Sequence, residues 1–267
     1  MNWWDQTLNL VGGCKAISPG CENCYAAMLA GTRQTHSRDV LHDSVTEWVR
    51  GKPVFNGVLT VLPPEHASWT LPLTWRGADD PVLGAGQPSL IFVGDMSDVF
   101  ISGRPKAVID RVIAPLIHSR HISLLLTKRA KRVAKYFSEP LHEKVLLRRQ
   151  RHLWLGFSAE SQEWFDRRWP HMRPLAVSGW VVFVSVAPML GPVALPPDFL
   201  VHGARVWVIC SGEQRCVTRP RYMEPDWARA LRDQCAAASV PFFMLQMTGR
   251  KEPPPDLLVR EFPARVE

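Results

Sequence analysis

Three cysteines stand within eleven residues near the start of the chain: Cys14, Cys21 and Cys24, in the stretch CKAISPGCENCYA (residues 14–26). Several sulfur atoms on one short segment are typical of a metal ion or an iron–sulfur cluster, which needs converging thiolate ligands. A Pro-Gly pair before the second cysteine favours a tight turn, and helix-forming residues follow the third. The pattern predicts a ligand-bearing loop that leads directly into a helix.

The number of clustered cysteines leaves two kinds of site open. A closed structural zinc site has four ligands, so zinc here would have to borrow His36, His42 or a distant cysteine. A cluster held by three protein ligands instead leaves one iron free for a substrate or cofactor.

The other three cysteines are expected in different places. Cys210 falls in an apolar run and Cys235 on an amphipathic helical segment, so both are expected in the core. Cys216 lies in the polar loop GEQRCVTRP and is the candidate catalytic residue, as a hydrogen-atom donor, or else an additional ligand.

Length and composition bound the class of protein. The chain has 267 residues, of which 46% are hydrophobic, enough for one large domain of barrel size. No apolar run approaches the roughly 20 residues of a membrane span, and the N-terminus does not have the pattern of a secretory signal. Clustered cysteines also fit reduced thiols better than a disulfide framework. We therefore expect a soluble cytoplasmic protein without a membrane partner.

The formal net charge is +7, and the basic residues are clustered. Such clusters engage phosphates, although a solvated basic face is the simpler interpretation of any single one. Four of them make nucleic acid a candidate partner: KRAKRVAK (128–135), LRRQRH (147–152), DRRWPHMR (166–173) and TRPR (218–221). The residues expected on the nucleic-acid backbone are Lys128, Arg129, Arg148, Arg149 and Arg151.

Seven apolar runs, separated by helices or long crossovers, indicate parallel strands covered on both faces. They begin with the first ten residues and continue with SLIFVGDMSD, HISLLLTKR, HLWLGFSAES, WVVFVSVAP, ARVWVICSGE and VPFFMLQM. We predict an α/β fold with a TIM-barrel-like, incomplete parallel (β/α) barrel as a single domain over residues 1–250. Residues 251–267 are expected to form an extended tail.

Residues 25–87 have no sustained periodicity and are predicted to form an insertion or lid after the cysteines. A helix is expected from Tyr25 to about Gly31, then a short helical segment ending near Gly51, then a strand with a turn at Asn56-Gly57. The tryptophans of this insertion, Trp48, Trp69 and Trp75, are interpreted as packing residues rather than platforms for bases.

Polar residues follow the apolar runs, and in barrels the chemistry lies at the carboxyl ends of the strands. They are Asp95, Ser97 and Asp98, then Thr127, Lys128 and Arg129, Ser158 and Glu160, Ser185, Ser211 and Glu213, and finally Gln246. Asp98 or Ser97 could instead cap the following turn. A buried Glu213 would need a cationic partner, for which Arg215 and Arg219 are the nearby candidates.

The loop with its C-x-x-CYA ending resembles the cluster loop of radical S-adenosylmethionine (SAM) enzymes, particularly the spore photoproduct lyase-like branch. The first cysteine gap differs, because radical SAM loops usually show C-x3-C-x2-C with an aromatic residue before the last cysteine. The whole chain resembles a three-cysteine-motif family of unknown function found in phages and bacteria. The matching stretches are GCKAISPGCENCYA, FVGDMSDVF, LLLTKRAKRVAKYF, LWLGFSAESQEWFDRR, FVSVAPMLGPV and WVICSGE followed by LRDQC.

The resemblance implies a 4Fe-4S cluster on the three clustered cysteines, SAM on its open iron, and an external one-electron donor. It implies an enzyme that abstracts hydrogen from a substrate, for which we expect DNA or RNA undergoing repair or modification. The residues expected to bind SAM are Asp95, Ser97, Asp98, Lys128, Ser158, Glu160 and Glu213. The alternative function is a non-catalytic nucleic-acid-binding protein with a zinc or structural iron–sulfur site.

Overall fold

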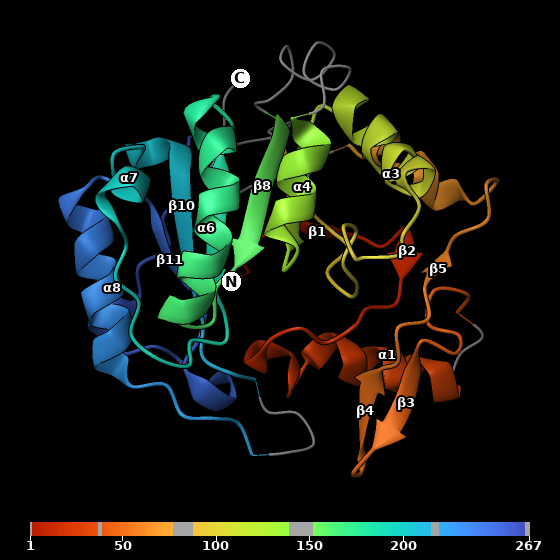
Figure 1. Cartoon of the computed structure of the whole chain (residues 1–267), viewed down its shortest axis with the longest axis horizontal. Helices are drawn as coiled ribbons and strands as arrows, with labels where there is room; N and C mark the ends of the chain where they lie inside the picture. The colour runs from red at the N-terminus through yellow and green to blue at the C-terminus, as the bar shows by residue number, and fades with distance from the viewer. Residues whose placement is uncertain (1, 37–38, 77–87, 139–151, 215–218, 265–267) are drawn as a thin grey trace.

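A computed structural model describes residues 2–36, 39–76, 88–138, 152–214 and 219–264. Within these residues a seven-stranded, all-parallel sheet is the centre of the fold, in the order β1-β6-β7-β8-β9-β10-β11. The sheet is curled into a half-barrel and helices flank it (Figure 1). The α/β class and the parallel sheet agree with the sequence, and each of the seven apolar runs supplies one strand.

The strands of the sheet are β1 (Gln6–Leu8), β6 (Leu90–Val93), β7 (Ile122–Thr127), β8 (Leu153–Ser158), β9 (Val182–Val186), β10 (Val206–Cys210) and β11 (Phe242–Met244). The longer helices that follow them are α3 (Lys106–His118), α4 (Ala130–Phe137), α6 (Gln162–Val177) and α8 (Pro225–Ala237). Shorter elements of the described fold include β2 (Val11–Gly12), β5 (Thr60–Val61), α2 (Leu71–Thr74) and α7 (Pro197–Leu200).

The convex face of the sheet packs on the helices. Alternate strand residues such as Leu125, Phe157 and Val184 are fully buried there in one hydrophobic cluster with residues of the helices. Because the concave face is buried as well, every residue of β6, β8, β9 and β10 is buried. This double burial explains why the strands appear in the sequence as uninterrupted apolar runs.

The concave face near the amino ends of the strands is filled by aromatic rings. Trp207 lies at the centre, with ring centroids 5.9 Å from Trp154 and 6.0 Å from Phe183. The ring of Trp3, which precedes β1, belongs to the same group, and its centroid lies 4.7 Å from that of Phe92 and 5.7 Å from that of Phe183. These rings close the interior of the half-barrel at that end.

The insertion contributes a helix and a hairpin. Helix α1 (Tyr25–His36) starts directly after Cys24 and runs further than the expected end at Gly31. The helical segment predicted to end near Gly51 is wrong, because β3 (Thr46–Val49) and β4 (Lys52–Phe55) form an antiparallel hairpin there. The hairpin turns at Arg50-Gly51. Both adopt positive φ, 50° and 76°, as a two-residue hairpin turn requires.

The tail covers the outer edge of β11. Met244 N donates to Val259 O at 2.8 Å, and Trp207 Nε1 donates to Glu261 O at 2.9 Å. Leu257 is fully buried and Phe262 lies 5.4 Å from the Trp207 ring. The tail is thus packed more fully than its Pro-rich, charged sequence predicted, and it covers an otherwise open strand edge.

The carboxyl ends of the strands face the insertion. In Figure 1 the arrowhead of β8 points toward α1, and the β3–β4 hairpin lies beyond that helix. The polar residues at the strand ends and the N-terminal loop are therefore on the same side of the sheet. No helix among the described residues is long and apolar enough to cross a membrane.

Candidate functional site

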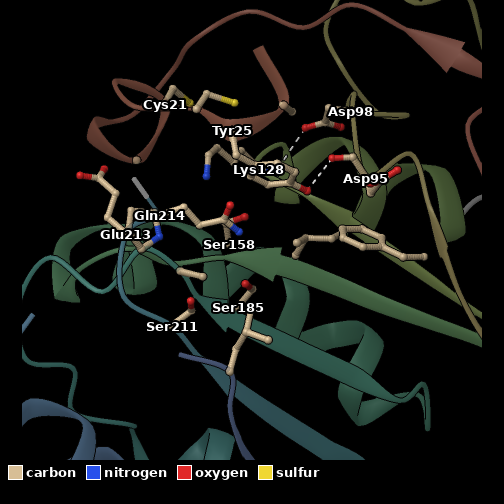
Figure 2. A pocket seen from close by; sticks show the side chains of 18 of the residues that line it. Cys21, Tyr25, Asp95, Asp98, Lys128, Ser158, Ser185, Ser211, Glu213 and Gln214 are labelled. Atoms are coloured by element: carbon tan, nitrogen blue, oxygen red, sulfur yellow. Dashed lines mark hydrogen bonds between the residues drawn. The ribbon is translucent and has the colours of Figure 1, made fainter. Parts of the chain in front are cut away.

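A cavity of about 550 Å³ opens at the carboxyl ends of the strands. All three clustered cysteines line it, so the loop that bears them (residues 14–24, the cysteine loop) forms its roof over the sheet. Figure 2 shows Cys21 above the cavity and Ser158, Ser185 and Ser211 below it. Part of the lining is aromatic, with Trp3, Trp4 and Phe92.

The three thiols are free and half-buried. Burial raises the pKa of Cys14 to about 12, with nearby Asp98 adding to the shift and Arg129 opposing it. Burial also raises the pKa of Cys24. In the metal-free protein both groups are therefore held as thiols, and binding a cationic centre would release their protons.

Arg129 fastens the start of the cysteine loop to the sheet. Its Nη1 donates to Asp98 Oδ2 at 3.0 Å and to Cys14 Sγ at 3.6 Å, and its Nη2 donates to Lys15 O. Asp98 also accepts from Thr127 Oγ1 at 2.7 Å and from Lys128 N at 3.1 Å. The Arg129 side chain is only 8% exposed, so its charge acts here and not on the outer surface.

Glu160 fastens the middle of the loop. Its Oε1 accepts from Gly20 N at 3.1 Å, and its Oε2 accepts from Arg168 Nη1 at 2.9 Å. Burial alone would raise the pKa of Glu160, but Lys128 and Arg168 outweigh burial and lower it to about 2. Glu160 is thus an ionised, fully buried carboxylate at physiological pH.

Glu213 fastens the end of the loop. Asn23 Nδ2 donates to Glu213 Oε2 at 2.9 Å, and Arg221 binds the same carboxylate through its backbone N and its guanidinium. The Arg221 guanidinium also donates hydrogen bonds to Pro19 O at 3.1 Å and to Glu22 Oε2 at 3.2 Å. Burial opposes ionisation of Glu213, but these hydrogen bonds prevail and lower its pKa. The cationic partner that the structure describes is Arg221 and not Arg219, and the other expected candidate, Arg215, lies outside the described residues.

The cavity itself presents several polar groups to a ligand. Lys128 lines it, and Figure 2 shows its side chain near the centre. Asp95 lines it too; burial raises the pKa of its carboxyl, and its backbone O accepts from Tyr25 OH at 2.7 Å. Ser97 Oγ and Gln246 Nε2 are buried without a hydrogen-bond partner among the described residues. Buried polar atoms of this kind are costly unless something in the cavity satisfies them.

The structure brings most of the expected site residues together. Those that line the cavity are Cys14, Cys21, Cys24, Asp95, Ser97, Asp98, Lys128, Arg129, Ser158 and Glu213, whereas Glu160 sits behind Gly20. Asp98 also caps the turn after β6, since Phe100 N donates to it at 2.9 Å. Asp98, Glu160 and Glu213 therefore contact the cysteine loop or the protein around it.

The other predictions have mixed outcomes. Cys210 and Cys235 are fully buried, as expected of core residues. Cys216 and the basic residues Arg148, Arg149 and Arg151 lie outside the described residues. The described strand that follows the last three, β8, begins at Leu153, at the end of the sheet opposite the cavity.

Two arginines of the site were not predicted. Arg168 was counted only within a basic run, yet its side chain is 4% exposed and aimed at Glu160. The burial of Arg168 was predictable from the sequence, because Phe165, Arg168, Trp169 and Met172 repeat at helical spacing on one buried face. Arg221 has no such signal, because nothing in its local sequence indicates a contact with Glu213, eight positions earlier.

The potential metal ligands of the cavity include three thiols. In the described part of the chain, no three His, Cys, Asp or Glu side chains are arranged to hold a metal ion. The chemistry nevertheless fits a three-thiolate centre, because three free thiols line one cavity. A four-ligand zinc site fits less well: His42 Nδ1 pairs with Asp39 at 2.7 Å, and His36 Nδ1 bonds Thr32 O at 2.8 Å.

Comparison with known proteins gives a family and no activity. No curated protein and no solved structure matches the chain. A family model described as a protein of unknown function, DUF5131, matches residues 1–254, which is nearly the whole length. The chain therefore belongs to the DUF5131 family.

Proposed function

We propose that this protein is a radical SAM enzyme, in which Cys14, Cys21 and Cys24 hold a 4Fe-4S cluster and the substrate is nucleic acid. One observation carries the proposal: three free thiols on one loop line a cavity at the carboxyl ends of a curled parallel sheet. The resemblance of the cysteine loop to the cluster loop of these enzymes, and of the half-barrel to an incomplete TIM barrel, supports it.

In the proposed site, the cysteine loop holds the cluster and residues at the strand ends bind SAM. When bound to Cys14, Cys21 and Cys24, the cluster would supply the electron that cleaves SAM for removal of hydrogen from the substrate. This chain fixes the thiols: Arg129, Glu160 and Glu213 hold the start, middle and end of the cysteine loop. A rigid loop keeps three ligands in register for one centre and limits the access of water and oxygen.

The groups left for SAM are those that face the cavity and do not hold the loop. Asp95 and Ser97 could accept from its ammonium, Lys128 could pair with its carboxylate, and Ser158 could bond its ribose hydroxyls. The unpartnered Ser97 Oγ is an acceptor of the required kind. An external one-electron donor would complete the cycle, with Cys216 as the candidate hydrogen-atom donor.

The test is cleavage of SAM by the loaded enzyme. The protein is reconstituted anaerobically with iron and sulfide, reduced and given SAM, and 5′-deoxyadenosine is measured. We expect deoxyadenosine from the wild type and none from Cys14→Ser, Cys21→Ser or Cys24→Ser. Cys235→Ala, on helix α8 away from the cavity, is the matched control and should retain the activity. A loaded protein that neither binds nor cleaves SAM would refute the enzymatic proposal.

A second candidate is a nucleic-acid-binding protein in which the cysteines hold zinc or a structural cluster. Exposed cationic residues favour it: Lys15 follows the cavity-lining Cys14, and Arg50 lies in the turn of the β3–β4 hairpin. It also accommodates the long gap between the first two cysteines. Metal and sulfide content separates the two candidates.

A further inference from the structure

Trp48 is the one exposed tryptophan of this protein, whose eleven tryptophans all fall within the described residues. Its side chain is 62% exposed, whereas Trp69 is buried and Trp75 packs against the main core. A single exposed apolar side chain is ordinary. The next residue of the strand, Val49, is 42% exposed on the other face of the hairpin, and Leu29, 45% exposed, lines the cavity.

The hairpin that carries Trp48 is attached to the cysteine loop. Lys52, the first residue after its turn, donates through Nζ to Glu22 O at 2.7 Å and to Asn23 Oδ1 at 3.2 Å. Trp48 lies directly across the hairpin from Pro53, the residue after Lys52. Phe55, at the far end of the same strand, lines the cavity. Trp48 and Phe55 therefore lie on the same face of the hairpin, two residue pairs apart.

The turn itself is unusual. Arg50 adopts a left-handed φ of 50°, a conformation that arginine rarely takes and that asparagine or glycine would adopt more readily. An observed backbone outlier of this kind is a reason to look for function. Arg50 and Lys15 are both exposed, and neither forms an ion pair with any residue that the structure describes.

We propose that Trp48 and Arg50 bind unpaired nucleotides next to the one that enters the cavity. The indole face would stack on a base and the guanidinium would contact the adjoining phosphate. Charge complementarity favours this occupant, because the chain carries a net charge of +7 and the exposed Arg50 lies two residues from the tryptophan. The inference rests on the proposed function in taking nucleic acid as the substrate, and it names which form of nucleic acid is bound and where.

The test uses the full-length protein and a short fluorescein-labelled single strand of mixed sequence, as DNA and as RNA, followed by fluorescence anisotropy. Stacking on one base is worth about 1–3 kcal/mol, so Trp48→Ala should weaken binding about tenfold, while Trp48→Phe should retain most of the affinity. Arg50→Ala should reduce the slope of log affinity against log salt by about 0.7. Val177→Ala removes an equally exposed apolar side chain at the opposite end of the sheet and should bind as the wild type does.

Two results would overturn the inference. One is Trp48→Ala binding within twofold of Val177→Ala, which would place the contact elsewhere. The other is a wild type that binds neither strand at low salt, which would turn attention to a protein, such as the electron donor, as the occupant of the hairpin tip. Deoxyadenosine formation without nucleic acid, measured on the same preparation, shows separately whether the proposed SAM chemistry stands.

Discussion

The concave face of the sheet has two regions built by the same strands, one packed with rings and one hollow. Along β9, Phe183 lies in the packed region and Ser185, two residues on, lines the cavity. Along β10 and just beyond it, Trp207 lies in the packed region and Ser211, four residues on, lines the cavity. Inward-facing residues on a strand are two positions apart. A small side chain at one such position leaves open space for a ligand, whereas a ring at the position before it fills the core.

The packed region also shows how closely its sequence is matched to its space. A Cβ at Gly156 would lie 2.2 Å from the Phe183 ring, so only glycine leaves room for that ring on the neighbouring strand. In the hollow region the next inward pair is Ser158 and Ser185, which face each other across the two strands. Small hydroxyls there leave volume for a ligand and supply hydrogen bonds.

The largest expected effect lies in the packed region. Trp207→Ala removes the ring at its centre and should lower the free energy of unfolding by about 3–5 kcal/mol, because a cavity replaces a buried ring. Urea denaturation followed by circular dichroism measures it. A cost below about 1 kcal/mol would mean that the aromatic layer is not a true core.

The next effect concerns the buried pair that holds the cysteine loop. Glu160→Ala leaves the Arg168 guanidinium buried without its carboxylate, and we expect a loss of about 3 kcal/mol in urea denaturation. The double variant Glu160→Ala/Arg168→Met removes both charges and should recover part of the loss. If the double variant is less stable than the single one, the unpaired charge is not the cause.

The same pair predicts a pH dependence. The pKa of Glu160 is lowered to about 2 in the folded protein, below its ordinary value of about 4.5, so its contribution is complete above that ordinary value and is lost as pH falls toward 2. Stability of the wild type should therefore fall more steeply between pH 5 and pH 3 than that of Glu160→Gln. Equal slopes in urea denaturation at several pH values would contradict the assignment.

The smallest effect on stability is expected in the hollow region. Ser185→Leu places a larger side chain in open volume and should change the free energy of unfolding by no more than about 1 kcal/mol. It should nevertheless abolish binding of SAM to the reconstituted protein, measured by equilibrium dialysis. Ser185→Ala is the matched control and should bind SAM. Undiminished binding by the leucine variant would place the ligand outside this cavity.

Much of the fold was predictable because burial on both faces gives each strand an uninterrupted apolar run. The hairpin was not, since Thr46–Val49 is exposed at three of its four positions and its turn uses Arg50-Gly51 instead of a preferred pair. The cysteines and the strand-end residues were predictable as a set, because parallel strands bring their carboxyl ends together. The contacts of the carboxylates were not predictable, because Glu160 and Glu213 accept hydrogen bonds from residues 140 and 190 positions away in the chain.

The most direct test of the central claim is the metal content of the three-cysteine site. Protein purified anaerobically is assayed for iron, zinc and acid-labile sulfide, beside the Cys14→Ser, Cys21→Ser and Cys24→Ser variants. A cluster predicts about four irons and four sulfides per chain in the wild type and a loss of both in each variant. About one zinc per chain with no acid-labile sulfide would contradict the cluster and favour a zinc-bearing binding protein.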